Sequence, residues 1–190
     1  MNQDLYKKID FEVTDLHFNW NIFCNVYAVS DDQVKILNKV DSTFFGTIQS
    51  IYWQAIILQL SRLTDEEFMG KGKQKRNISL YTLFNDIKSD MNSEELDLLH
   101  RIKEQIENYA KNLRIYRSKK IAHSDYIYVM KKESISFEGL RKRDIEKLLK
   151  AIRDFMNFIN KKYFDSTTLY DEIMGLNAGK DLVDYLSDRV

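Results

Sequence analysis

The segment R-I-Y-R-S-K-K-I-A-H-S-D, at residues 114–125, contains the side chains of this sequence that are best suited to chemistry. Arg117 has a permanent charge and a fork of N–H donors that matches phosphate oxygens, whereas the imidazole of His123 has a pKa near neutrality and can move a proton. Such a pair suits metal-independent RNA cleavage, in which the ribose 2′-hydroxyl attacks the adjacent phosphate. Asp125 could orient the imidazole and Ser118 could hydrogen-bond the scissile group, so the segment supplies four candidate catalytic residues.

The spacing of Arg117 and His123 restricts how these two side chains can meet. On an ideal α-helix, six residues correspond to about 600° of rotation and ~9 Å of rise, so the two side chains leave different faces. We therefore expect that the helix ends near Ile121 or Ala122, or that a second copy of the chain completes the pocket.

Basic residues around this segment predict where an RNA backbone would be held. Lys+Arg and Asp+Glu number 29 each, so nucleic-acid binding has to come from local segregation of charge. Acidic residues outnumber basic ones at 1–32 and 165–190, and the positive charge lies between. We expect backbone contacts from the loop at 71–76 and from four side chains: Lys111, Arg114, Lys119 and Lys120. In the alternative interpretation, which composition alone favours, these cations form only a solvated helix end that suits the helix dipole.

The remaining reactive residue types do not indicate a metal or redox centre. Three histidines and one cysteine lack the paired spacing of a zinc or iron site, so we expect no metal and no cofactor. His17 is interpreted as a partly buried packing residue and His100 as a surface residue. With Cys24 as its single cysteine, the chain cannot form an intramolecular disulfide, which is typical of a reducing compartment. The sequence also shows no signal peptide and no membrane-spanning run, so we expect a cytoplasmic protein that does not enter a membrane. The acidic run at 65–67 is expected to serve capping and solvation.

The spacing of apolar residues predicts an all-α protein, a bundle of four to five long helices. The chain has no proline, and apolar side chains recur every three or four residues. Helices are expected at about 8–29, 31–39, 42–63, 79–90, 93–121 and 140–163, with short ones near 168–174 and 178–187. The helix at 42–63 is apolar around much of its circumference, which is typical of a central buried helix.

Two non-helical connections between the helices are expected. The glycine-containing basic stretch at 69–77 is predicted to be an exposed loop, and a short extended excursion is expected after the motif, at 126–137. The whole chain, 1–190, is expected to form a single domain, with 165–190 as a short helical C-terminal appendage.

The segment R-S-K-K-I-A-H-S-D resembles the R-x(4 to 6)-H signature of the HEPN superfamily, the higher eukaryotes and prokaryotes nucleotide-binding domain. It is closest to the R-N-K-R-I-A-H-S-D form of the abortive-infection (AbiU-like) branch. The order of the preceding segments is also similar: I-I-L-Q-L-S-R-L-T-D ends a helix, and N-I-S-L follows after an irregular stretch.

This resemblance implies a helical bundle that commonly forms homodimers and acts as a metal-independent endoribonuclease in toxin or antiphage systems, with RNA as the substrate and an antitoxin protein as a further partner. It makes Arg117 and His123 the catalytic pair. Ser118 departs from the Asn, Asp or His that usually follows the arginine. The superfamily also implies an alternative, a catalytically inactive module that binds nucleotides or other proteins.

Overall fold

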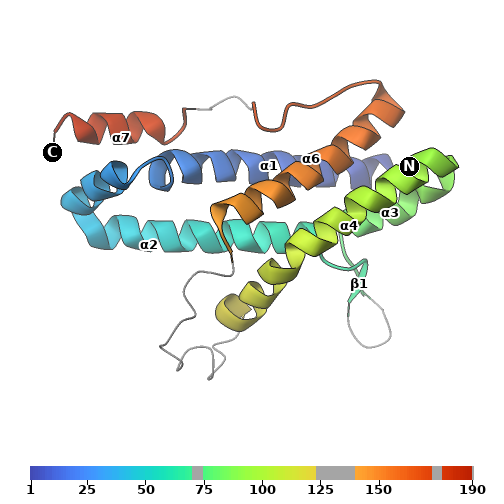
Figure 1. Cartoon of the computed structure of the whole chain (residues 1–190), viewed down its shortest axis with the longest axis horizontal. Helices are drawn as coiled ribbons and strands as arrows, with labels where there is room; N and C mark the ends of the chain where they lie inside the picture. Colours follow the sequence, from blue (N-terminus) through green and yellow to red (C-terminus); the bar gives the residue numbers. More distant parts are fainter. Residues whose placement is uncertain (70–74, 123–139, 173–176, 190) are drawn as a thin grey trace. The chain divides into compact units, whose positions relative to one another are not determined.

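The computed structural model describes residues 1–69, 75–122, 140–172 and 177–189, most of which are helical (Figure 1). Among these residues there are six α-helices: α1 (Gln3–Tyr27), α2 (Asp31–Leu63), α3 (Leu80–Ile87), α4 (Ser93–Tyr116), α6 (Lys142–Phe164) and α7 (Lys180–Ser187). The 3-10 helix η1 (Lys88–Asp90) follows α3, and the π-helix η2 (Arg117–Ala122) follows α4. Two short antiparallel strands, β1 (Phe68–Met69) and β2 (Lys75–Arg76), pair Phe68 with Arg76 and Met69 with Lys75. The prediction of an all-α fold is confirmed.

Side-chain caps explain where several helical segments begin. Asp41 interrupts α2 with non-helical backbone angles (φ −162°, ψ 96°), and its Oδ1 accepts a hydrogen bond from the Phe44 N–H at 2.9 Å. Two helical segments therefore meet at Asp41, between the helices expected at 31–39 and 42–63. Asn92 and Glu95 form a reciprocal capping box at the start of α4, with hydrogen bonds of 2.9 and 3.0 Å. Each cap satisfies N–H groups that a helix leaves unpaired in its first turn.

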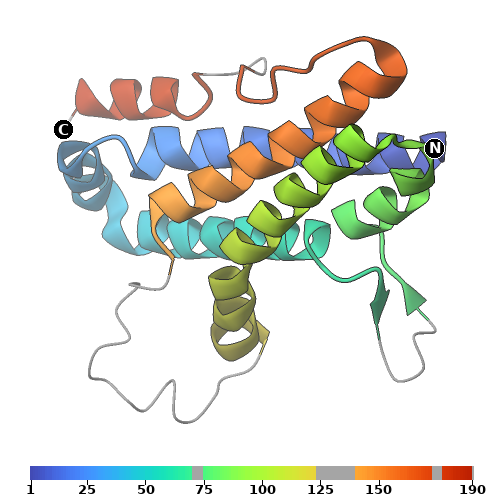
Figure 2. The ribbon, with the colours of Figure 1, turned by 45° about the vertical axis from the view of Figure 1, so that its right-hand side comes forward.

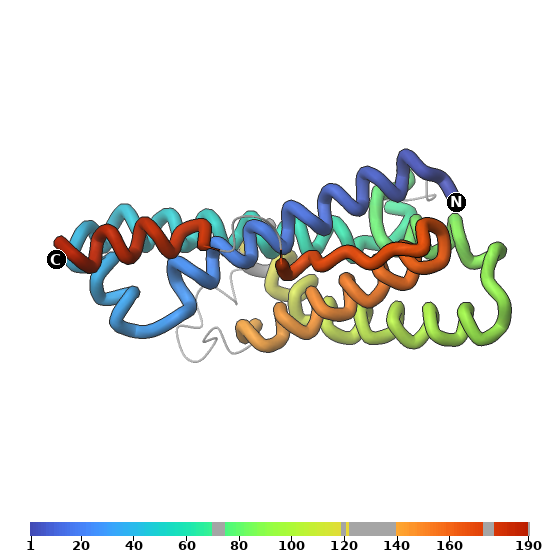
Figure 3. The backbone as a smooth tube through the Cα atoms, turned by 90° about the horizontal axis from the view of Figure 1, so that it is seen from above, coloured from blue at the N-terminus to red at the C-terminus, as the bar shows by residue number. Residues whose placement is uncertain are grey.

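The chain divides into two compact units, and the first consists of residues 1–13 and 58–168. Within it, α4 and α6 lie side by side along much of their length (Figures 1 and 3). Figure 2 shows α4 continuing into η2, and the β1–β2 hairpin between α2 and α3. The apolar faces of α4 and α6 form much of the core of this unit: Leu99, Ile102, Ile106, Leu113, Ile145, Leu148, Leu149, Ile152, Phe155, Met156 and Ile159. The last turns of α4 are therefore held in place by the buried apolar side chains of this unit.

The second unit consists of residues 14–57 and 169–190. Val26, Leu37, Phe45 and Val183 form a buried cluster that joins its parts of α1 and α2 to α7. Gly179 precedes α7 with φ +83°, and a Cβ at this position would lie 2.5 Å from a methyl carbon of Val26. The close packing of α7 on α1 therefore depends on the absence of a side chain at this residue.

Several sequence expectations need correction. The two short strands include residues 69, 75 and 76 of the predicted loop at 69–77. The described part of the predicted helix at 168–174 has a turn instead. The expectation of a central buried helix at 42–63 is met on one side of this part of α2, where Phe45, Ile56 and Leu60 are buried, whereas Phe44 and Ile51 on another side remain exposed within the part of the chain that the structure describes. The extended excursion at 126–137 lies outside the described residues, and none of the described helices is long and apolar enough to cross a membrane.

Candidate active site

The backbone changes its helical geometry at the first residue of the candidate motif. Helix α4 ends at Tyr116, and Arg117 begins the π-helix η2, in which hydrogen bonds run from residue i to i+5 instead of i+4. The rotation of 600° calculated for an α-helix therefore does not apply between Arg117 and Ala122. Such π turns are rare and often occur at functional sites. His123 and Asp125 follow directly and lie outside the described residues.

Arg117 is held by an acidic residue from the end of α2. Its Nη1 lies 3.0 Å from Oδ1 and 3.3 Å from Oδ2 of Asp65. The side chains are 30% and 22% exposed, respectively, so the ion pair is partly shielded and still open to solvent. An arginine fork has two edges, and this contact uses Nη1; within the part of the chain that the structure describes, the edge formed by Nε and Nη2 has no such partner and can take a second anion.

Arg114, one turn earlier in α4, is bound to the interior of the first unit. Its Nη2 donates to the carbonyl oxygen of Thr64, a residue with no exposed surface, and lies 3.3 Å from the hydroxyl of Tyr81. Burial raises the pKa of that hydroxyl to about 12, although Arg114 acts in the opposite direction, so the phenol stays neutral. A basic side chain of α4 thus caps one of the last carbonyls at the end of α2.

These two contacts act on neighbouring residues. Thr64 and Asp65 accept from Arg114 and Arg117, which are three residues apart and hence on the same side of a helix. The sequence LTD at the end of α2 thereby fixes the position of the basic end of α4. These contacts join the segment at the end of α2 to the motif at the end of α4, two segments whose order along the chain was all that the sequence showed.

A charged cleft opens beside Asp65. It has a volume of about 300 Å³, and its lining includes three cations and two carboxylates: Lys8, Arg62, Arg76, Glu12 and Asp65. Glu12 lies 3.5 Å from the Lys8 ammonium and 3.1 Å from the Arg62 guanidinium. The two cations are exposed while Glu12 is half-buried, and ion pairs of such solvent-exposed cations contribute little to stability. The cleft therefore offers cations that a phosphate could recruit.

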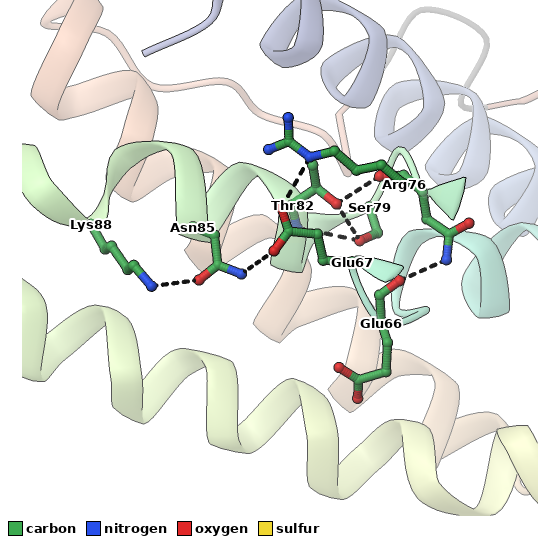
Figure 4. A network of polar contacts seen from close by, with 8 residues as sticks. Glu66, Glu67, Arg76, Ser79, Thr82, Asn85 and Lys88 are labelled. Carbon is green, nitrogen blue, oxygen red and sulfur yellow. Dashed lines mark hydrogen bonds and ion pairs between the residues drawn. The ribbon is translucent and has the colours of Figure 1, made fainter. Parts of the chain in front are cut away.

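The base of the β1–β2 hairpin is fastened to α3 by a polar network (Figure 4). Glu67 accepts from Arg76 Nε at 3.0 Å and from Asn85 Nδ2 at 2.7 Å, one to each carboxylate oxygen. The Thr82 hydroxyl donates to the carbonyl of Asn77 at 2.6 Å. The network fixes both ends of the basic stretch that the sequence assigned to RNA contact, because it holds residues before β1 and after β2.

The other predicted site residues differ in how they are placed. Lys111 and Ser118 are exposed, in α4 and η2 respectively, and the backbone of Lys119 and Lys120 belongs to η2. The structure brings Arg114 and Arg117 to the end of α2. The partner that the sequence did not reveal is Asp65, which had been assigned to capping and solvation. No pattern of local spacing could have found it, since 52 residues separate it from Arg117.

The histidines and acidic residues of the described ranges form no alternative centre. His17 is buried and stacks on Tyr170 with ring centroids 5.8 Å apart, while the exposed His100 meets the ring of Phe84 edge-on at 5.1 Å. His100 lies at the surface as expected, and His17 is more deeply buried than the sequence indicated. Within residues 1–69, 75–122, 140–172 and 177–189, no group of three or more His, Cys, Asp or Glu side chains could hold a metal ion.

Comparison with known proteins identifies the family. A HEPN-type family model described as AbiU2 matches residues 3–181. The chain belongs to the HEPN AbiU2 family. No curated protein and no solved structure gave a match. The matched range contains the end of α2, the hairpin, α4 and η2, so the contacts of Arg117 described above lie inside the AbiU2 domain. The resemblance noted in the sequence is confirmed, including its abortive-infection branch.

Proposed function

We propose that this AbiU2-family protein is a metal-independent endoribonuclease of a toxin or abortive-infection system, built as a single HEPN domain that acts as a homodimer in the cytoplasm. The observation that carries the proposal is the arginine of the motif: Arg117 stands at a change from α- to π-helix with one edge of its guanidinium bound to Asp65. A side chain fixed in this way is suited to receive a phosphate on its other edge.

In the proposed reaction, the imidazole of His123 removes the proton from a ribose 2′-hydroxyl. The 2′-oxygen then forms a bond to phosphorus and the bond from phosphorus to the 5′-oxygen breaks. The leaving oxygen takes up a proton from water, and the imidazolium of His123 returns its proton to the solvent. The products are a 2′,3′-cyclic phosphate and a 5′-hydroxyl end. Arg117 stabilises the extra negative charge of the pentacovalent phosphorane, while Ser118 and Asp125 hydrogen-bond the scissile group and the imidazole.

Asp65 acts on this reaction as a positioning residue for Arg117. A free arginine side chain loses conformational entropy when it closes on a phosphate, whereas one already bound at Nη1 has fewer rotamers to lose. The cost is a neighbouring negative charge, which weakens the attraction of Arg117 for phosphate. Cations along the charged cleft and on α4 and η2, including Lys111, Lys119 and Lys120, offset this charge and hold the RNA backbone.

Arg114 fits this scheme differently from its basic neighbours. Its guanidinium already bonds a buried carbonyl and a buried phenol, so we assign it a structural role at the end of α2 in place of direct phosphate contact. Lys111 can reach RNA without disturbing the fold, since it is exposed.

Cleavage of labelled RNA by the purified protein in the presence of EDTA tests the proposal. We expect His123→Ala and Arg117→Ala to lose at least about 100-fold in rate, the scale on which a general acid–base group contributes. The matched control is His100→Ala, which removes an exposed imidazole from the same unit and leaves the rate unchanged. Cleavage by His123→Ala at the wild-type rate contradicts the proposal. Phosphate binding that needs Arg117 without any cleavage supports the alternative, an inactive nucleotide-binding or interaction module.

A further inference from the structure

The charged cleft begins where the arginine of the motif is held. Asp65 lines the cleft and also binds Arg117, so an RNA strand whose scissile phosphate lies on Arg117 brings a neighbouring nucleotide to the cleft. The three cations of the cleft come from separate parts of the first unit, Lys8 from α1, Arg62 from the end of α2 and Arg76 from β2. The volume of about 300 Å³ is at the lower end of the range for ligand sites, which suits a single nucleotide.

Glu12 occupies the place that an anion would take between two of these cations. Its Oε1 lies 3.5 Å from Nζ of Lys8 and its Oε2 lies 3.1 Å from Nη2 of Arg62, so each carboxylate oxygen serves one cation. The two non-bridging oxygens of a phosphodiester can take over both contacts, because the side chains of Lys8 and Arg62 are 52% and 63% exposed and can turn toward it. Glu12 is therefore an internal competitor of an incoming phosphate.

The charges of the cleft match one phosphodiester. Arg76 gives Nε to Glu67 at 3.0 Å, and its two terminal nitrogens make no hydrogen bond to the residues that the structure describes (Figure 4). Apart from the Arg117–Asp65 pair, the cations of the cleft and the carboxylates bound to them differ by one positive charge: Lys8, Arg62 and Arg76 against Glu12 and Glu67. A phosphodiester has one negative charge, whereas a terminal phosphate has almost two. The excess therefore fits a nucleotide within a chain.

An exposed aromatic ring lies beside these cations. Phe11 precedes Glu12 in α1 and is 64% exposed, and Nζ of Lys8 lies 5.6 Å from the centre of its ring. Proteins that bind single-stranded nucleic acid combine cations that follow the backbone with aromatic rings on which the bases stack. Stacking on such a ring requires an unpaired base. The arrangement thus fits a single strand better than a duplex or an acidic protein segment.

We propose that the charged cleft and Phe11 form a subsite for one unpaired nucleotide of the RNA, next to the scissile phosphate. The phosphodiester of this nucleotide binds Arg62 and Arg76 in place of Glu12, and its base stacks on the ring of Phe11. The inference rests on the proposed function for the position of the scissile phosphate on Arg117. It makes the substrate single-stranded beside the cleavage position, and it makes Glu12 a limit on how tightly the strand is held.

Binding of a non-cleavable 2′-deoxy oligonucleotide at several salt concentrations tests the phosphate contacts. Arg62→Met should raise Kd about tenfold and reduce the slope of log Kd against log salt concentration by about 1, as expected for the loss of one phosphate contact. Glu12→Gln should lower Kd by up to about fivefold, because it removes the competing charge. A purely structural role of Glu12 predicts an unchanged or raised Kd. The matched control is Lys150→Met, which removes an exposed cation of α6 outside the cleft and should change neither quantity.

Fluorescence of 2-aminopurine in the same oligonucleotide tests the stacking, since this base loses emission when it stacks. Wild-type protein should quench it. Phe11→Leu should abolish the quenching and raise Kd on the order of tenfold without changing the salt slope. Phe44→Leu replaces a ring of the second unit that is 54% exposed, and it should match wild type. A duplex of the same sequence should bind more weakly than the single strand.

These outcomes separate the subsite from the proposed reaction. A wild-type salt slope in Arg62→Met, no gain of affinity in Glu12→Gln or unchanged quenching in Phe11→Leu overturns the inference. So does binding of a polyglutamate peptide that depends on Arg62 when oligonucleotide binding does not, because the cleft then serves an acidic protein partner. Binding through the cleft by a chain that cleaves no RNA refutes only the proposed function, since the deoxy oligonucleotide reports binding alone.

Discussion

Replacing Arg114 by methionine should destabilise the protein without weakening its grip on RNA. Methionine keeps the apolar stem of the side chain but removes the guanidinium. The carbonyl of Thr64, a fully buried residue, then loses the hydrogen bond that it accepts from Arg114, and the hydroxyl of Tyr81 loses its contact with the cation. The sequence had assigned Arg114 to phosphate contact, so this substitution separates a structural role from a binding role.

The expected loss of unfolding free energy is about 2 to 3 kcal/mol. A hydrogen bond from a charged donor contributes roughly 1.5 to 3 kcal/mol, and an unpaired buried carbonyl costs a similar amount. The Arg114–Tyr81 ring contact, at 5.9 Å, adds on the order of 0.5 kcal/mol. For a chain of this size the loss corresponds to a fall of roughly 5 to 10 °C in Tm.

Thermal and urea unfolding measure this change, with Lys111→Met as the control on the same helix. Lys111 is exposed, so its replacement should change stability by no more than about 0.5 kcal/mol. Binding of a non-cleavable 2′-deoxy analogue at several salt concentrations completes the comparison. Removal of one phosphate contact should lower the salt slope by about 1 for Lys111→Met and leave it unchanged for Arg114→Met. Wild-type stability combined with a reduced slope in Arg114→Met would refute the reasoning.

Two further predictions concern the packing of α7 and the start of α4. Gly179→Ala should destabilise the protein by about 2 kcal/mol in chemical unfolding, because it combines a strained φ with a close contact to Val26. Gly46→Ala, in an open helical position, should instead stabilise the protein by up to about 1 kcal/mol. Equal effects at both glycines would contradict this reasoning. The hydrogen bond from Lys162, followed by that from the Asn92 backbone, lowers the pKa of Glu95, so its contribution is present above the ordinary carboxyl pKa of about 4.3 and is lost as pH falls through the lowered value. Glu95→Gln should therefore reduce Tm at neutral pH and match wild type near pH 2, as followed by circular dichroism; an equal difference at both pH values would exclude this explanation.

The sequence predicts the parts of the fold that depend on local chemistry. Apolar spacing of three and four residues locates α4 and α6, since a helix has to turn its apolar side to a neighbour. Asp41 and Asn92 cap the helical segments that were expected to begin at 42 and 93, and such starts depend on local chemistry because the side chain of a cap bonds an N–H only a few residues away.

Features that depend on distant residues could not be predicted in this way. The Arg117–Asp65 ion pair joins residues 52 positions apart, and the spacing within each segment contains no information about it. The exposed apolar side chains of α2, such as Phe44 and Ile51, show the same limit. Apolar composition identified a helix that needs cover on most of its circumference, but whether that cover comes from the same chain or another is decided by the arrangement of helices.

The π-helix at the motif bears on how the number of residues between the arginine and the histidine can change. An α-helical turn closes from residue i to i+4 and a π-helical turn from i to i+5, so an exchange of one for the other absorbs an insertion or deletion of one residue. Arg117 is the first residue of η2, so a change of length after it leaves the contact with Asp65 in place. Length variation of an R-x(4 to 6)-H motif would then alter the turn and the approach of the imidazole, while the anchored guanidinium stays in place. Deletion of one residue between Ser118 and Ala122 is the corresponding change in this chain.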